Sequence, residues 1–301
     1  MSTKVCSIEH SERPLSQPKQ GTATDKARAD KARWHALILP REHGAWGLLL
    51  VPLVTGAGVA FHHSHHVVPV LLLLTAALAL FWMRTPVESL LATSLIHTQS
   101  KDEQRTVLGA TLALAVVAAL SLGTLLWAGR NPFLWLIGCA AATAFVTQAI
   151  LRKLGRSTRM LAEVVGTIGL TGSAPAAYYV VTGRFDATAC MLWLANLIFA
   201  GNQIHYVQLR IHTARIEGLR SKFARGWTFA LGQAVMAAAL VLASVRGYLP
   251  ALALIAFVPV LFRGWFYFFK KPTPLQVRRL GWNELTQAVI FCVLFIGSFS
   301  L

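Results

Sequence analysis

Residues 107–128 read VLGATLALAVVAALSLGTLLWA, and none of these 22 residues carries a charge at neutral pH. Wound as an α-helix with a rise of 1.5 Å per residue, the stretch is about 33 Å long, which matches the roughly 30 Å hydrocarbon core of a bilayer. An uninterrupted apolar run of this length is typical of a transmembrane helix and not of a helix in a soluble core. The sequence therefore predicts a membrane protein.

Eight further apolar runs flank this one, and glycine, proline, asparagine or charged residues mark the turns between them, as in the string GRNP at 129–132. The fold class expected for residues 41–301 is all-α, a polytopic bundle of nine transmembrane helices. The nine runs are 44–61, 67–83, 107–128, 132–151, 162–181, 187–207, 226–245, 248–269 and 283–300.

The composition agrees with this prediction and excludes other classes of protein. Of 301 residues, 55% are hydrophobic and only 13% are charged, and the mean hydropathy is +0.55; soluble domains carry about 25% charged residues. The formal net charge is +16, but a soluble nucleic-acid binder would need many more surface charges. The four cysteines are scattered without a CxxC pair, so we expect neither a disulfide framework nor a cysteine-ligated zinc.

Lysine and arginine are distributed unevenly between the two sides of the predicted bundle. Twenty-four lie on the side of the N-terminus, whereas the loops on the other side hold Arg130, Arg184 and Arg246, and Arg263 lies within the eighth span. Cytoplasmic loops carry the positive excess, so we expect the N-terminus inside, the C-terminus outside and a multi-pass location in the cytoplasmic (inner) membrane. Anionic lipids of the inner leaflet, and not nucleic acid, are then the expected partners of the charge.

Residues 1–40 form a separate region. They are basic, contain several prolines and have no long apolar run, so they do not resemble a cleavable signal peptide. We expect a disordered cytoplasmic tail.

Polar and ionisable residues inside the predicted spans gather at the cytoplasmic ends of five helices. Such residues are costly in a membrane and usually functional, so we expect a polar chamber that opens toward the cytoplasm. As substrate-binding residues we select Arg41, Glu42, His43, Arg84, Asn202, His205, Gln208 and Arg210, and as catalytic bases Glu88, Glu163 and Glu284.

Each of these residues also has a purely structural interpretation. Glu163 and Glu284 stand near helix N-termini, where a carboxylate interacts favourably with the helix dipole. Arg84 and Glu88 are spaced for a local i,i+4 pair, and the amides of the sixth span could form interhelical hydrogen bonds. The four histidines between positions 62 and 66 could bind zinc or copper, but a short polar loop explains them equally well.

The stretch PREHGAW at 40–46, with Val51-Pro52 after it, resembles the signature of the YwiC-like membrane proteins. The later stretches KPTPL at 271–275 and LGWNEL at 280–285 are similar to the C-terminal part of the same family. The resemblance extends over about residues 38–300.

The architecture also resembles the UbiA superfamily of intramembrane prenyltransferases, which have nine helices, an internal N-terminus and a chamber toward the cytoplasm. In that family, Asp-rich motifs at the ends of the second and sixth helices hold magnesium and the prenyl diphosphate. Residues 169–183 followed by NQIH at 202–205 resemble the run that leads into the second motif. Here the corresponding stretches are RTPVE at 84–88 and NQIHYVQLR at 202–210, without an aspartate, so we expect no magnesium and no other cofactor.

Three classes of function agree with these features, and one of them is a purely structural membrane subunit, in which the chamber residues would pair with one another. The other two involve a ligand. The first is a membrane protein that binds a lipid or isoprenoid. Its catalytic form would be a UbiA-like transferase in which arginines, and not a metal, bind the phosphate. The second is a transporter or a lipid-binding protein without catalysis. Transporters usually bind substrate near the bilayer midplane, so polar residues at one end favour the first class.

Overall fold

The computed structural model describes residues 37, 43–91, 98, 100–129, 132–155 and 157–300, and within these ranges every regular element is helical. The elements are α2 (His43–Ala60), α3 (Val67–Leu90), α4 (Lys101–Trp127), α5 (Pro132–Lys153), α6 (Arg159–Thr171), α7 (Ser173–Thr182), α8 (Ala187–Thr213), α9 (Leu219–Val245), the 3₁₀ helix η1 (Ala251–Phe257), α10 (Val258–Phe269) and α11 (Val277–Gly297).

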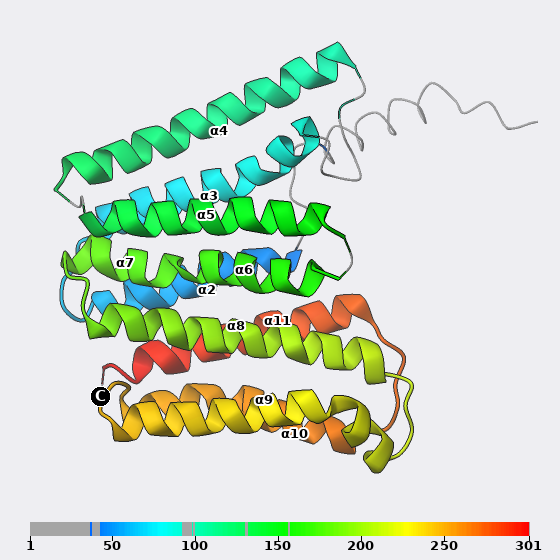
Figure 1. The fold of residues 1–301 in the computed structure, drawn as a ribbon. Helices are drawn as coiled ribbons and strands as arrows, with labels where there is room; N and C mark the ends of the chain where they lie inside the picture. Colours follow the sequence, from blue (N-terminus) through cyan, green and yellow to red (C-terminus); the bar gives the residue numbers. More distant parts are fainter. Residues whose placement is uncertain are drawn as a thin grey trace, which may run out of the picture.

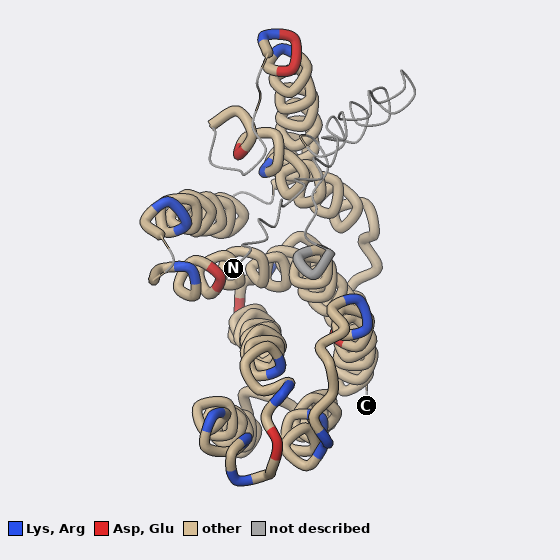
Figure 2. Tube along the Cα trace, turned by 90° about the vertical axis from the view of Figure 1, so that its right-hand side faces the viewer, with Lys and Arg blue, Asp and Glu red and all other residues tan. Residues whose placement is uncertain are grey.

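The helices lie side by side and run in alternate directions, with α6 and α7 forming one rod and η1 and α10 another (Figure 1). At one end of the bundle, α3, α5, α8 and α10 end and α4, α6, α9 and α11 begin. Figure 2 looks at this end and shows lysine, arginine and acidic residues gathered there. Among the described residues, the charged side chains near the opposite end are Arg184, Asp186 and Arg246. We call the charged end the polar end.

Eight of these rods are long and apolar enough to cross a membrane, among them Arg159–Thr182 and Ala251–Phe269. The protein is thus an all-helical, multi-pass integral membrane protein, as predicted. The first predicted span, 44–61, corresponds to α2, whose described apolar part, Trp46–Ala60, is shorter than the other spans.

The outer surface of the bundle is apolar, as a lipid-facing surface should be. Helix α4 packs on α3 at one edge (Figure 1) and turns large hydrophobic side chains outward. Leu112 is 57% exposed, Leu120 is 67% exposed and Trp127 is 94% exposed. Continuous apolar surface of this kind would make a water-soluble protein aggregate, whereas contact with lipid chains satisfies it.

Small residues and aromatic residues build the interior. Helices α2 and α7 approach so closely that a Cβ atom added at Gly56 would lie 2.1 Å from the backbone oxygen of Ala174. Small residues permit this kind of contact between transmembrane helices. Between α8, η1 and α11, the buried rings of Phe199, Phe257, Phe291 and Phe295 form one cluster, in which Phe199 stacks on Phe291 with centroids 4.1 Å apart. We call this cluster the aromatic layer.

Candidate functional site

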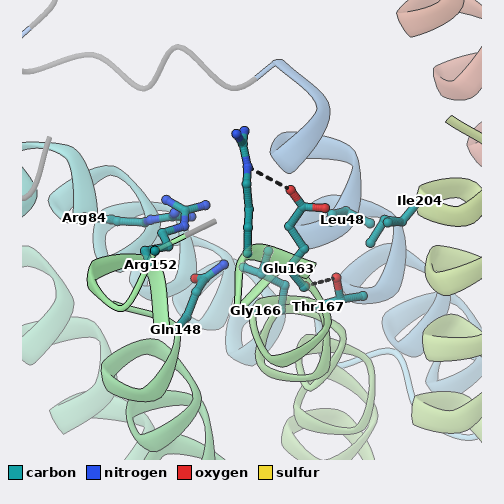
Figure 3. A pocket seen from close by; sticks show the side chains of 11 residues that line it. Leu48, Arg84, Gln148, Arg152, Glu163, Gly166, Thr167 and Ile204 are labelled. Atoms are coloured by element: carbon teal, nitrogen blue, oxygen red, sulfur yellow. Dashed lines mark hydrogen bonds and ion pairs between the residues drawn. The ribbon is translucent and has the colours of Figure 1, made fainter. Parts of the chain in front are cut away.

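A pocket of about 590 Å³ lies at the polar end between α2, α3, α5, α6 and α8. Figure 3 shows Arg84, Arg152 and Gln148 on one flank and Glu163 and Thr167 on the other. The side chains that line it converge from helices far apart in the sequence. They belong to Leu48, Arg84, Gln148, Arg152, Gly155, Arg159, Glu163, Gly166, Thr167, Leu170 and Ile204.

Two arginines from different helices share one carboxylate beside the pocket. Arg84 Nε donates to Glu88 Oε1 across one turn of α3, at 2.9 Å, and Arg152 of α5 places a terminal nitrogen 3.5 Å from the same oxygen. The Arg84 side chain is only 13% exposed. The bridging carboxylate offsets the repulsion between the two guanidinium groups, so both can remain at the pocket wall.

The opposite flank carries a weaker pair. Arg159 Nε lies 3.7 Å from Glu163 Oε1, and the Arg159 side chain is 78% exposed. An ion pair so open to solvent contributes little to stability, typically below about 1 kcal/mol, so Arg159 is available to another anion. The described residues that line the pocket thus include three arginines and one carboxylate, and this excess of positive charge favours an anionic ligand.

The inner part of the pocket is mostly apolar, with one amide and the hydroxyl of Thr167, which donates to Glu163 O. Leu48, Leu170 and Ile204 lie there, and Leu170 is eleven residues along α6 from Arg159, or about 16 Å deeper. The buried Gln148 side chain packs directly on Gly166, where an added Cβ would be 2.1 Å from Gln148 Nε2. Glycine at 166 therefore makes room for this amide. A charged mouth above an apolar floor fits an amphiphile.

A second group of polar side chains is buried between α8, α10 and α11. Arg263 donates to Glu284 Oε1, and Gln203 Nε2 donates to the backbone oxygen of Glu284 at 2.9 Å. The Arg263 guanidinium lies 4.0 Å above the Tyr206 ring, so a cation–π contact covers one of its faces. The buried polar layer, as we call it, comprises Asn202, Gln203, Tyr206, Arg210, Gln233, Arg263, Tyr267, Glu284 and Gln287.

Comparison with protein-family models gives a match to the model described as YwiC-like protein over residues 39–178. Over this stretch the chain is similar to the YwiC-like family. The resemblance seen in the PREHGAW stretch is thereby confirmed. No curated protein and no solved structure matches the chain. All pocket residues except Ile204 come from the YwiC-like stretch, whereas the buried polar layer lies beyond it.

The structure divides the predicted site residues between these two places. Arg84 and Glu163 line the pocket, and Glu88 forms ion pairs with Arg84 and Arg152 beside it. Arg210 and Glu284 belong to the buried polar layer on the other side of α8. Asn202 is buried one helical turn before Tyr206, on the same face of α8. Instead of the single chamber that the sequence predicts, α8 separates two sites, because Ile204 faces the pocket while Gln203 and Tyr206 face α10 and α11.

The remaining predicted residues have local contacts or lie outside the description. His205 packs edge-on against Phe229 of α9, with ring centroids 5.2 Å apart. Gln208 Nε2 lies 3.1 Å from Met160 Sδ of α6, so His205 and Gln208 face different neighbouring helices. Arg41 and Glu42 lie outside the described residues, and His43 begins α2 but its side chain is not described.

Several polar residues of the two sites are not among the predicted site residues. Gln148, Arg152 and Arg159 line the pocket, and the sequence identifies the two arginines only as cytoplasmic loop charges. Arg263 is central to the layer. An arginine inside a predicted span was its signal, because such a residue requires a partner within the bundle.

The histidine loop makes ordinary local contacts. His62 Nε2 lies 3.1 Å from Ser300 Oγ, and the ring of His63 meets that of Tyr178 edge-on at 6.3 Å. Within the described ranges, no three side chains of histidine, cysteine, aspartate or glutamate are grouped so as to hold a metal ion.

Proposed function

We propose that this protein binds an anionic amphiphile, a lipid or isoprenoid with a phosphate head group, in the pocket between α3, α5 and α6. The observation that carries the proposal is the arrangement of Arg84, Arg152 and Arg159 around the mouth of a pocket with an apolar floor. Guanidinium groups bind phosphate through paired hydrogen bonds and keep their charge when partly buried. The alkyl chain would lie against Leu48, Leu170 and Ile204.

The orientation in the membrane is part of the proposal. We take α2 as a ninth crossing, because its 18 residues span about 27 Å and run antiparallel to α3 (Figure 1). The excess of lysine and arginine at the polar end then puts that end and the N-terminus in the cytoplasm, and the C-terminus outside. The pocket would open toward the inner leaflet of the cytoplasmic membrane.

A UbiA-like transferase is the catalytic form of this proposal. The ends of α3 and α8 carry the stretches that resemble the two motif positions of that superfamily. In such an enzyme Glu163, at the pocket wall, would act as the base, and the arginines would hold the phosphate that the family holds with magnesium. Because Asn202 and Arg210 lie across α8 from the pocket, binding has more support than catalysis.

Transport is the alternative, and one feature favours it. The rod formed by α6 and α7 is interrupted at Gly172, and transporters often bind substrate at broken helices. The hydroxyls beside this break are occupied, since Thr171 donates to Thr167 O and Ser173 donates to Leu49 O and Leu170 O. The polar groups gather at one end instead of the break, which favours binding from one side.

Native mass spectrometry of the gently purified protein tests the proposal. Wild type should retain an amphiphile whose mass and phosphorus content identify its class. Arg152→Gln removes one pocket arginine and should release most of it, while the adjacent Lys153→Gln, outside the pocket, should retain it. Retention that does not differ between these two variants would refute the pocket as the binding site.

A further inference from the structure

We propose a second site, which binds a phosphate group in the buried polar layer between α8, α10 and α11. It rests on different residues from the pocket and does not depend on the function proposed for it. The layer carries hydrogen-bonding atoms without a partner among the described residues and an excess of positive charge inside the membrane-spanning part of the chain. A phosphate group would supply both the missing partners and the negative charge.

Arg263 presents one complete edge of its guanidinium group. Its NH1 nitrogen donates to Glu284 Oε1, whereas Nε and NH2 are buried and have no partner among the described residues. Nε and NH2 together form the edge that binds two oxygens of one oxyanion in parallel hydrogen bonds. The side chain is only 14% exposed, and Tyr206 covers one face of the group, so its orientation is fixed.

Two more cations lie at the ring of Tyr267, one helical turn along α10 from Arg263. Arg210 lies 4.9 Å above the Tyr267 ring, and its buried Nε has no partner in the described chain. Lys222 is 2% exposed and lies 5.3 Å from the same ring, where it donates to Lys270 O. Three cations against Glu284 leave positive charge in a region where uncompensated charge is costly.

The remaining acceptor and donor groups of the layer suit a phosphate that still carries a proton. Glu284 Oε2 is buried and unpartnered among the described residues, so it can accept a hydrogen bond from a P–OH group. Gln233, packed on Gly264 beside Arg263, has both amide atoms buried and without a partner in the described chain, and its Nε2 can donate to a phosphate oxygen. A ligand with both acceptors and a donor fits this set better than a carboxylate.

The aromatic layer closes the site on its inner side. Along α11, Phe291 is seven residues beyond Glu284, or about 10 Å further from the polar end, and it stacks on Phe199 of α8. A ligand would therefore enter and leave from the polar end, either as free phosphate or as the phosphate monoester head group of a lipid.

Isothermal titration calorimetry with inorganic phosphate, on the full-length protein in detergent, tests this proposal. The protein carries Arg152→Gln in addition, which removes a pocket arginine. Arg263→Lys keeps the charge that pairs with Glu284 but loses the two-pronged edge, and should weaken phosphate binding about 10- to 100-fold, the effect of losing a charge-assisted hydrogen bond. Glu284→Gln replaces the carboxylate that accepts a hydrogen bond from the P–OH group by an amide, which is a weaker acceptor, and should also weaken binding. Arg279→Lys, on an exposed position of α11, is the matched control and should change nothing.

A parallel measurement in nanodiscs of phosphatidylcholine, with and without phosphatidic acid, identifies the source of the group. Sensitivity of phosphatidic acid binding to Arg263→Lys would assign a lipid head group, and sensitivity of free phosphate alone would assign the inorganic ion. If internal water satisfies the layer, Arg263→Lys and Glu284→Gln will leave the affinity for both probes unchanged, and the proposal is wrong. If Arg152→Gln has no effect in the pocket assay, the pocket proposal is wrong, but the response of phosphate binding to Arg263→Lys is not affected. Each proposal can therefore be refuted without the other.

Discussion

Replacing Gly56 by alanine should strongly destabilise the bundle. The new Cβ would lie 2.1 Å from the backbone oxygen of Ala174 and 2.8 Å from its carbonyl carbon, whereas real Cβ atoms essentially never come closer than 3.0 Å to another heavy atom. The obstacle is backbone, so no side-chain rotation removes it. Helices α2 and α7 would have to separate by about 1 Å at their point of closest approach.

The cost follows from the packing that this separation disrupts. Overpacking a tight interior typically costs about 1–3 kcal/mol, and a gap of 0.5–1 Å forfeits a quarter to a half of each dispersion contact along the interface. Residues of α2 and α7 around the contact, such as Leu53, Ala57 and Ala177, are almost fully buried. We therefore expect a loss near 3 kcal/mol, which lowers the melting temperature by roughly 5–10 °C.

Thermal unfolding in detergent, followed by intrinsic tryptophan fluorescence, measures this effect. Gly123→Ala in α4 is the control, because nothing lies within 4 Å of the added Cβ there, and its melting temperature should stay within about 2 °C of wild type. A Gly56→Ala protein as stable as the Gly123→Ala protein would show that α2 and α7 do not pack as described.

Three further predictions concern the pocket, the core and the topology. Gly166→Ala should displace the Gln148 amide and weaken binding of a phosphate amphiphile up to about tenfold in a titration, the effect of one hydrogen bond, whereas Gly138→Ala, in open space on α5, should not. Phe291→Ala should cost about 3–5 kcal/mol in unfolding experiments because the ring is fully buried and stacked, while the exposed Val289→Ala should cost less than about 0.5 kcal/mol. Reporter fusions in the α5–α6 connection should indicate the cytoplasm and fusions at the C-terminus the exterior; the reverse at either point would refute the proposed orientation.

The helical spans could be predicted because each depends on local information. An apolar run such as 107–128 has one stable form in a bilayer, since lipid offers no partner for its backbone groups. The structure places α4 over Lys101–Trp127, with the N-terminus extended by one and a half turns of polar residues. A hydropathy profile does not identify those polar residues as part of the helix. Ser100 caps the helix N-terminus there by accepting a hydrogen bond from the Glu103 backbone nitrogen.

The site could be predicted only in part because it depends on rotation of helices about their axes. The depth of Arg84, Glu163 and Glu284 follows from their positions near helix ends, and all three do lie toward the polar end. Which neighbour each helix face meets is decided by packing, for instance by the close contact of Gly166 with Gln148. The sequence predicts one chamber because it gives the depth of these residues but not the direction in which they face. In the structure, Ile204 faces the pocket from one side of α8 and Tyr206 faces the buried polar layer from the other.

Titration of a short-chain phosphatidic acid into the purified protein tests the central claim most directly, with the corresponding diacylglycerol as the probe that lacks the phosphate. Wild type and Lys153→Gln should bind phosphatidic acid with equal affinity and well above diacylglycerol. Arg152→Gln should bind it about 10- to 100-fold more weakly, because a charge-assisted contact to the head group is lost. Equal affinity of wild type and Arg152→Gln for phosphatidic acid, or equal affinity of wild type for the two probes, would contradict an arginine-lined phosphate pocket.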